Sequence, residues 1–264
     1  MFSGFLDIAG GKHIHYLFVE SQYDFSVDPV IIWFNGGPGC SSLLGFATEH
    51  GPFLMKDGKK DFEKDPNPWS WNNNANVLYI ESPVGVGYSW IESGYDPKPE
   101  IDDKDTAVDA LAAINEWLLR FPEYKGRDLY IAGESYGGIY VPYLIFENLL
   151  QKEEDRIPVK GMIIANGVTD WKVDTTPASM AMLFWHNLID LDTEQKLKEN
   201  NCFPWKLSVY AGTEGTRNEV ECDSLEDMIM DDVLPGINPY DIYRTCYDNY
   251  SPNEREGKVT LLNG

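Results

Sequence analysis

The chain has 264 residues, of which 43% are hydrophobic and 13% aromatic, so it can bury a large core as one domain or two and does not have the composition of a disordered chain. Its formal net charge of −22 argues against nucleic acid and anionic membranes as partners, because both are polyanions, and is compatible with an acidic compartment or with an acidic solvated surface. No run of about 18 apolar residues occurs, so we predict no membrane span.

The N-terminal part of the chain has strand patterns. Residues 2–8 and 13–20 alternate enough to predict two antiparallel strands, with a glycine turn between them. The apolar run at 30–34 is bounded by Pro29 and a glycine cluster, which is typical of a buried central strand. A second buried strand is predicted over 76–81.

Helices and strands then alternate. Thr106 and Asp109 resemble a capping box, and the apolar residues that follow predict an amphipathic helix that covers a sheet face. Strands are predicted over 128–132 and 159–165, with a helix over 139–151 between them. This alternation predicts a mostly parallel sheet with helices on both faces.

From about residue 177 the pattern becomes helical, with polar, glycine-rich connections. Helical segments are predicted near 178–189, 192–200 and 223–233. We therefore predict an α/β core over 1–176, a helical insertion (cap) over 177–250 and an exposed, cleavable segment over 251–264.

A serine lies on the turn after the strand at 128–132. Gly133, Ser135 and Gly137 fit the pattern G-x-S-x-G, in which a nucleophilic serine stands on a tight turn between a strand and a helix. The flanking glycines let the turn close, and the free N–H groups of the helix N-terminus can stabilise negative charge beside the hydroxyl. The apolar strand before the motif and the helix after it favour a functional site over a chance match.

A glycine-dense loop over Asn35–Ser42 follows the strand at 30–34. It lacks the G-K-[ST] ending of a phosphate loop. It resembles instead the loop that supplies an oxyanion-hole N–H in α/β-hydrolases.

No metal or organic cofactor is expected. His13 and His15 share one face of a predicted strand without a third ligand nearby, and the four cysteines lack C-x-x-C spacing. Asn249 begins a glycosylation sequon, which is a weak signal of secretion.

Several motifs together resemble those of the serine carboxypeptidases, over nearly the whole chain. They are WFNGGPGCSS at 33–42, EHGP at 49–52, NPWSWN at 67–72, ESPVGVG at 81–87 and GESYGG at 133–138. The resemblance implies an α/β-hydrolase fold with a helical cap, whose C-terminal part lies outside this chain. It also implies a cofactor-independent hydrolase that removes the C-terminal residue of a peptide in acid through an acyl-enzyme.

The resemblance also assigns residue roles. Ser135 would be the nucleophile, and the N–H groups of Gly37 and Tyr136 would form the oxyanion hole. The substrate's free carboxylate would be held by Asn35, Gly36, Glu49 and Glu134. Because close carboxylates cannot all be ionised, such a site should work best in acid.

The chain departs from the family in the rest of the triad. The expected order is Ser, Asp, His, but the one histidine after Ser135 is His186, which matches a non-catalytic family segment. The resemblance implies that the Asp and His lie on a missing C-terminal part or light chain. By the same resemblance Cys202 pairs with Cys222, whereas Cys40 and Cys246 would bind that missing part.

The leading hypothesis is therefore the heavy chain of a lysosomal, vacuolar or secreted serine carboxypeptidase acting on peptides with a free C-terminus. A truncated chain is the alternative to a processed heavy chain, and relatives often form homodimers. Two other functions stay open, an acyltransferase or lyase on the same scaffold and a non-catalytic protective partner of other hydrolases.

Overall fold

The computed structural model describes residues 1–264 except 56–60, 95–100, 203–217, 235–236, 239 and 245–264. The chain divides into two compact units, Met1–Thr169 and Asp170–Gly264. The predicted boundary between an α/β core and a helical cap lies after residue 176, and this division into core and cap stays a prediction. The predicted exposed segment at 251–264 lies outside the described residues.

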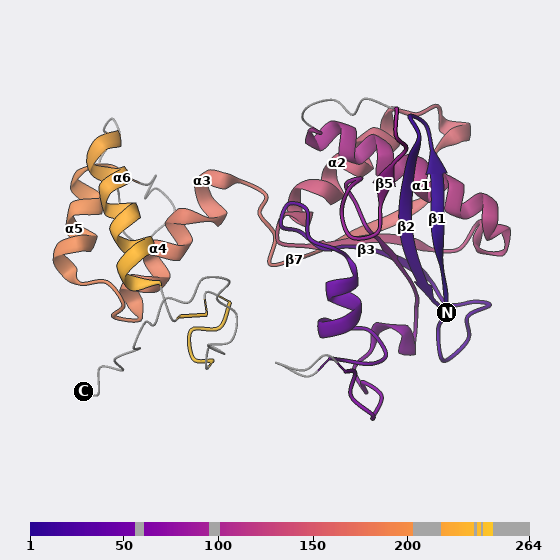
Figure 1. The fold of residues 1–264 in the computed structure, drawn as a ribbon, viewed down its shortest axis with the longest axis horizontal. Helices are drawn as coiled ribbons and strands as arrows, with labels where there is room; N and C mark the ends of the chain where they lie inside the picture. Colours follow the sequence, from indigo (N-terminus) through magenta and orange to yellow (C-terminus); the bar gives the residue numbers. More distant parts are fainter. Residues whose placement is uncertain (56–60, 95–100, 203–217, 235–236, 239, 245–264) are drawn as a thin grey trace. The chain divides into compact units, whose positions relative to one another are not determined.

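The first unit is built on one mixed sheet (Figure 1). Its strands run in the order β1-β2-β4-β3-β6-β7, and β5 pairs with β2 off this path. The pairs β1–β2, β2–β4 and β2–β5 are antiparallel, whereas β3–β4, β3–β6 and β6–β7 are parallel. The strands are β1 (Phe2–Ile8), β2 (Lys12–Val19), β3 (Val30–Phe34), β4 (Asn76–Ile80), β5 (Trp90–Ile91), β6 (Leu129–Glu134) and β7 (Val159–Ala165). The predicted hairpin is confirmed, and the sheet is mixed: its pairs from β4 to β7 are parallel as predicted, whereas the pairs made by β2 are antiparallel.

The central strands are apolar throughout because both of their faces are covered. On β3, Ile32 and Phe34 belong to one buried cluster, while Trp33 between them belongs to another. Successive side chains of a strand point to opposite faces, so the continuous apolar run supplies both clusters.

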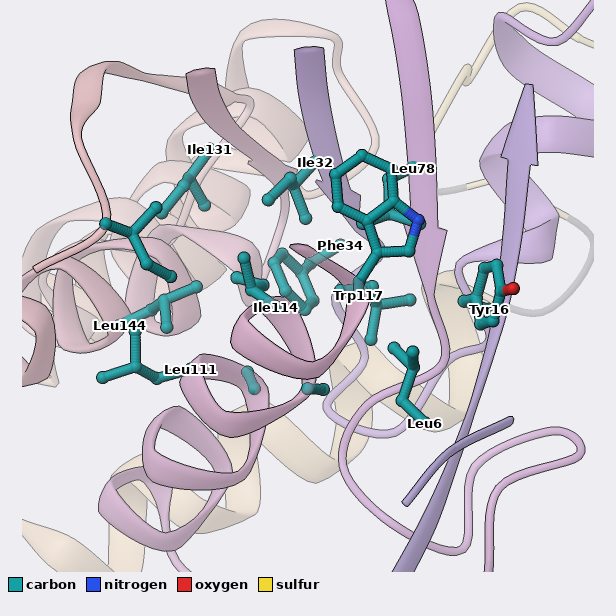
Figure 2. Packing of buried hydrophobic residues seen from close by; sticks show 14 of the residues in the cluster. Leu6, Tyr16, Ile32, Phe34, Leu78, Leu111, Ile114, Trp117, Ile131 and Leu144 are labelled. Carbon is teal, nitrogen blue, oxygen red and sulfur yellow. The ribbon is translucent and has the colours of Figure 1, made fainter. Parts of the chain in front are cut away.

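One face of the sheet is covered by α1 (Asp103–Arg120) and α2 (Gly137–Leu150), which lie together in Figure 1. Figure 2 shows Ile114 and Trp117 of α1 in the same cluster as the side chains of β3. The opposite cluster is covered by the segment that carries short helical turns at Gly45–Glu49 and Trp71–Asn73.

The predicted capping box at Thr106 and Asp109 is wrong. Helix α1 begins earlier, and the carboxylate of Asp102 accepts a hydrogen bond from the backbone N–H of Asp105 at 2.7 Å. Thr106 lies within the helix and donates its hydroxyl to the Asp102 carbonyl, while Asp109 forms an ion pair with Lys12. The physical reason is that the extended Asp102 offers a capping oxygen one turn before Thr106.

The second unit contains four helices among its described residues. They are α3 (Trp171–Asp174), α4 (Thr176–Trp185), α5 (Leu191–Glu199) and α6 (Glu219–Met228), and a helical turn at Ile229–Val233 continues from α6. Their apolar side chains form a separate cluster that includes Leu183, Leu197 and Leu225. The predicted helix at 178–189 ends at Trp185, because Asn187 adopts a left-handed φ of 56°. Within the described parts of the chain, no helix combines the length and apolarity needed to cross a membrane.

Candidate active site

Ser135 stands on the turn between β6 and α2. Its φ is 54°, a left-handed conformation that non-glycine residues adopt rarely. The turn is fixed by neighbouring backbone, because the Ser135 N–H donates to the Ala165 carbonyl at 3.1 Å and the Val168 N–H donates to the Ser135 carbonyl at 2.8 Å. The turn therefore has the strained geometry of a nucleophile elbow.

Small residues are required where this turn meets its neighbours. A Cβ on Gly138 would lie 2.5 Å from the Val168 carbonyl oxygen, and one on Gly133 would lie 3.0 Å from that of Phe34. By contrast, a Cβ on Gly137 would meet the Phe34 oxygen at 3.4 Å, which is an ordinary contact. The G-x-S-x-G spacing thus reflects a close approach at position 133 more than at position 137.

The glycine loop lies directly on the elbow. The parallel pairing of Phe34 with Gly133 brings the loops after β3 and β6 to the same edge of the sheet. A Cβ on Gly36 would be 2.4 Å from the backbone nitrogen of Tyr136 and 2.6 Å from the Glu134 carbonyl oxygen. Gly37, the next residue, has a φ of 116°, which side chains rarely tolerate.

Two acidic side chains meet on one amide beside the elbow. The Nδ2 group of Asn35 donates to Glu49 at 3.1 Å and to Glu134 at 2.8 Å. Its Oδ1 atom accepts from the indole N–H of Trp33 at 2.8 Å and from the Gly45 N–H at 2.9 Å. All hydrogen-bonding positions of the Asn35 amide are therefore used, which fixes its orientation.

The electrostatics of this cluster favour the protonated form of Glu49. Burial raises the pKa of Glu49; the hydrogen bond from Asn35 opposes the rise, and the charge of Glu134 adds to it. A carboxyl group that keeps its proton can donate a hydrogen bond to a third carboxylate, which two ionised glutamates could not do.

A group of packed aromatic rings lies next to the acid cluster, and the sequence predicts no role for it. It consists of the rings of Trp33, His50, Trp71 and Tyr79. His50 is buried between the rings of Trp71 and Tyr79, and the hydroxyl of Tyr79 lies 3.2 Å from its Nδ1 atom. Burial lowers the pKa of His50 to about 4, so the imidazole is neutral at neutral pH. The motifs that contain Trp33, His50 and Trp71 were the available signal, but nothing in their spacing revealed that these rings stack.

The side chain of Tyr136 takes no part in the predicted oxyanion hole. Its hydroxyl donates a hydrogen bond to the carboxylate of Asp103 at 2.9 Å. Burial, and then this hydrogen bond, raises the pKa of Tyr136 to about 12, so the phenol stays neutral. Its backbone N–H, rather than its side chain, is the group next to Gly36.

The remaining predicted residues lie elsewhere. Cys202 and Cys222 form a disulfide in the second unit, the pairing that the family resemblance implied. Cys40 is a free thiol among the described residues, and Cys246 lies outside them. His186 is exposed, and its Nδ1 atom contacts the Met182 carbonyl.

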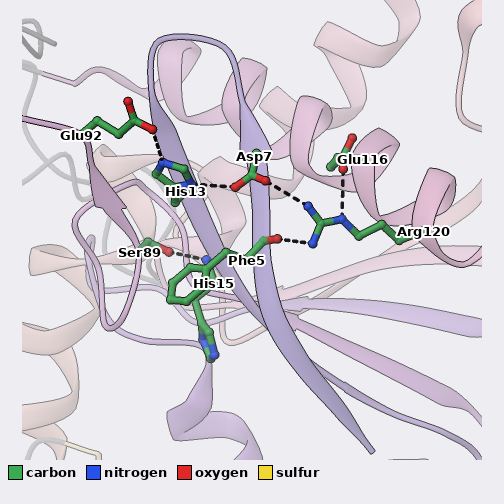
Figure 3. A network of polar contacts seen from close by, with 8 residues as sticks. All are labelled: Phe5, Asp7, His13, His15, Ser89, Glu92, Glu116 and Arg120. Carbon is green, nitrogen blue, oxygen red and sulfur yellow. Dashed lines mark hydrogen bonds and ion pairs between the residues drawn. The ribbon is translucent and has the colours of Figure 1, made fainter.

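The two strand histidines bind carboxylates. His13 lies between Asp7 and Glu92 in the network of Figure 3, and His15 contacts Glu81 at 2.9 Å. In the part of the chain that the structure describes, no group of three or more His, Cys, Asp or Glu side chains is placed to hold a metal ion.

Comparison with known proteins identifies the fold and the family of the chain. The structure superposes on a prohormone-processing carboxypeptidase of Saccharomyces cerevisiae with a TM-score of 0.62 and 23% identity, over 83% of this chain and 48% of that one. The fold is an α/β-hydrolase fold, as predicted. The family model for serine carboxypeptidases matches residues 1–262, and the chain belongs to that family.

Curated relatives lead to the same family. The lysosomal protective protein of Mus musculus is 36% identical over 246 residues, which are 93% of this chain and 49% of that protein. A serine carboxypeptidase-like protein of Arabidopsis thaliana is 40% identical, over 96% of this chain and 48% of its own length. The chain thus spans about half the length of the curated relatives it matches.

Proposed function

We propose that this chain carries the nucleophile and the carboxylate-binding half of a serine carboxypeptidase that acts in acid. The observation that carries the proposal is that the side-chain amide of Asn35 donates hydrogen bonds to both Glu49 and Glu134. Glu134 directly precedes Ser135 in the chain. A site that shares a proton between two acids next to an elbow serine is suited to the free C-terminus of a peptide.

In the proposed reaction Ser135 attacks the last peptide carbonyl of the substrate. The bond between Oγ and the carbonyl carbon forms, and the bond to the nitrogen of the terminal residue breaks, which releases a free amino acid. Water then hydrolyses the acyl-enzyme. The N–H groups of Gly37 and Tyr136 stabilise the oxyanion in both steps.

The substrate carboxylate is held by Asn35, the N–H of Gly36, Glu49 and Glu134. Its binding needs a protonated acid in the cluster, so peptide turnover falls as the pH rises through the pKa of the pair. Burial supports this pH dependence, because it raises the pKa of Glu49.

The general base and its orienting acid come from a part of the protein outside this chain. We propose a disulfide-linked C-terminal part or light chain that supplies the triad Asp and His and is bound through Cys40 and Cys246. We propose a lysosomal, vacuolar or secreted location, and the name of the mouse relative, lysosomal protective protein, supports the first of these. A homodimer is part of the same hypothesis.

The test uses the full-length protein and a matched pair of peptides, one with a free C-terminus and one amidated. Ser135→Ala should abolish turnover of both and leave binding of the free peptide intact. Glu134→Gln should weaken the acid preference for the free peptide and leave the amidated peptide unaffected. Equal losses on both peptides would contradict the carboxylate-binding role. Absence of turnover by the wild-type protein would favour a binding function instead.

A further inference from the structure

Glu81 is a buried acid that the proposed reaction does not use. It follows β4 directly and only 1% of its surface is exposed. Its carboxylate accepts hydrogen bonds from the Ser41 hydroxyl and from the Tyr88 N–H at 2.8 Å, and it lies 2.9 Å from Nδ1 of His15. These hydrogen bonds outweigh the effect of burial and lower the pKa of Glu81, so it is a buried charge. A buried charge is costly unless it is paired and hydrogen-bonded, and these three partners meet that requirement.

The chain makes room for this carboxylate. A Cβ on Gly87 would lie 1.8 Å from Oε1 of Glu81, so no other residue fits at position 87 while the acid keeps its place. The backbone of Glu81 is also held, through Ser89, to strand β2. The Ser89 hydroxyl accepts the His15 N–H at 2.8 Å, a contact drawn in Figure 3, and donates to the Glu81 carbonyl at 2.7 Å.

Ser41 connects Glu81 to the glycine loop. The loop begins at Asn35, whose N–H donates to the Ser42 hydroxyl at 3.2 Å, and that hydroxyl donates to the Ile80 carbonyl at 2.6 Å. Both serines therefore tie the end of the loop to the end of β4. Of these two ties, the one at Ser41 is to a full charge, and hydrogen bonds to charged groups are the stronger kind.

The middle of the loop is anchored more weakly. The Gly39 N–H donates to the hydroxyl of Tyr140 on α2 at 3.2 Å, and the Cys40 N–H donates to the Gly36 carbonyl at 3.0 Å. The conformation around Gly37 thus depends on where the chain is fixed at Ser41.

We propose that Glu81 is a positioning residue that holds the glycine loop, through Ser41, in the conformation that presents Gly37 to the oxyanion formed at Ser135. The inference rests on the proposed function and adds to it a residue outside the substrate site. Glu81 acts on the transition state and not on the substrate carboxylate, because its hydrogen bonds do not involve the Asn35 amide or the acids bound to it.

The effect on turnover should be large and specific. Loss of one oxyanion donor costs about 10²–10³-fold in kcat, and a displaced donor costs part of that. We expect Glu81→Gln to lower kcat on a free peptide by about 10–100-fold and to change KM by less than about threefold. Ser41→Ala should give a similar loss, since it removes the other partner of the same hydrogen bond.

The experiment compares Glu81→Gln, Ser41→Ala and the double variant in the full-length protein, with the melting temperature measured for each. If Glu81 and Ser41 act through the hydrogen bond between them, kcat of the double variant should be no lower than kcat of the less active single variant. The control is Asp109→Asn, which removes another buried carboxylate, the partner of Lys12 at 2.6 Å. It should lower the melting temperature and leave kcat unchanged.

Different results separate the possibilities. Wild-type kcat in Ser41→Ala, or losses that multiply in the double variant, would overturn the inference. A kcat loss in the Asp109→Asn control as large as that in Glu81→Gln would mean that general destabilisation explains the effect, and would overturn it too. If Glu81→Gln does not fold, Ser41→Ala alone decides. Failure of the wild-type protein to cleave peptides would contradict the proposed function rather than the role of Glu81.

Discussion

The substitution Gly36→Ala, which adds a single methyl group, should strongly lower the catalytic activity of the site. The Cβ of Gly36→Ala would be 2.4 Å from the Tyr136 nitrogen and 2.6 Å from the Glu134 carbonyl oxygen, and backbone atoms cannot rotate away. The loop and the elbow would have to separate, and a shift of about 1 Å can cost about 10²-fold in rate. The measurement is kcat/KM on a free peptide. The matched control is Gly137→Ala, whose Cβ has room and which starts α2; it should keep activity and stabilise the protein by about 0.5 kcal/mol.

The proton on the acid pair should also appear in stability. The pKa of Glu49 is raised in the folded state by burial, so the group contributes stability that is complete below its unfolded pKa of about 4.3 and is lost as the pH rises through the folded pKa. Glu49→Gln cannot titrate and should lack this dependence. Urea unfolding at several pH values between about 4 and 7 measures it. The wild-type protein should lose stability relative to the variant as the pH rises, and parallel pH curves would contradict the assignment.

At the scale of single elements, the start of α1 gives a sharp test of its cap. Asp102→Ala removes the oxygen that accepts the Asp105 N–H and should lower the free energy of unfolding by about 1 kcal/mol. Asp102→Asn is the control, because asparagine caps about as well as aspartate. Asp190, which caps α5 through the Thr193 N–H at 2.8 Å, should behave alike in the second unit. Equal losses in the Ala and Asn variants would mean that charge, not capping, is responsible.

The same helix shows what could be predicted from the sequence. The apolar face of α1 follows from periodicity, because burial on a sheet imposes one spacing over many residues. Its first residue does not, since Asp102 and Thr106 both suit a cap and only the backbone angles distinguish them. The alternation of helices and strands likewise predicts the class of the sheet but not the order of its strands. The elbow follows from the G-x-S-x-G pattern.

The contacts between distant segments are different. The sequence suggested Asn35, Glu49 and Glu134 through family resemblance, but it could not place them on one amide, because their spacing in the chain sets no distance in the fold. The sequence identifies Glu81 only as the last residue of a predicted strand and the first residue of the ESPVGVG motif. Its partners His15 and Ser41 come from two other segments, and nothing local in the sequence pairs them.

At the scale of the whole molecule, the edge of the sheet in the first unit is the feature to explain. Strand β7 stands at one end of the strand order, and its Met162 and Ile163 are 56% and 39% exposed. An edge strand with apolar side chains needs a cover, such as another strand or helix. We expect the part of the protein outside this chain to provide it, which agrees with the half-length match to the curated relatives.

Intact mass with and without a reductant tests that expectation directly. If a second chain is attached through Cys40 and Cys246, reduction under denaturing conditions should split a larger species into this chain and a partner of roughly 15–25 kDa, the size of a small domain or of the remainder of a large one. The disulfide between Cys202 and Cys222 lies within this chain, and its reduction adds only two hydrogen atoms to the mass, so it cannot imitate the effect. A Cys40→Ser, Cys246→Ser double variant is the control and should release the partner without reductant. If the mass is that of one longer, uncleaved chain in both conditions, the catalytic Asp and His lie on the same polypeptide as Ser135. If the mass is that of this chain alone, the protein has no part that could supply the catalytic Asp and His.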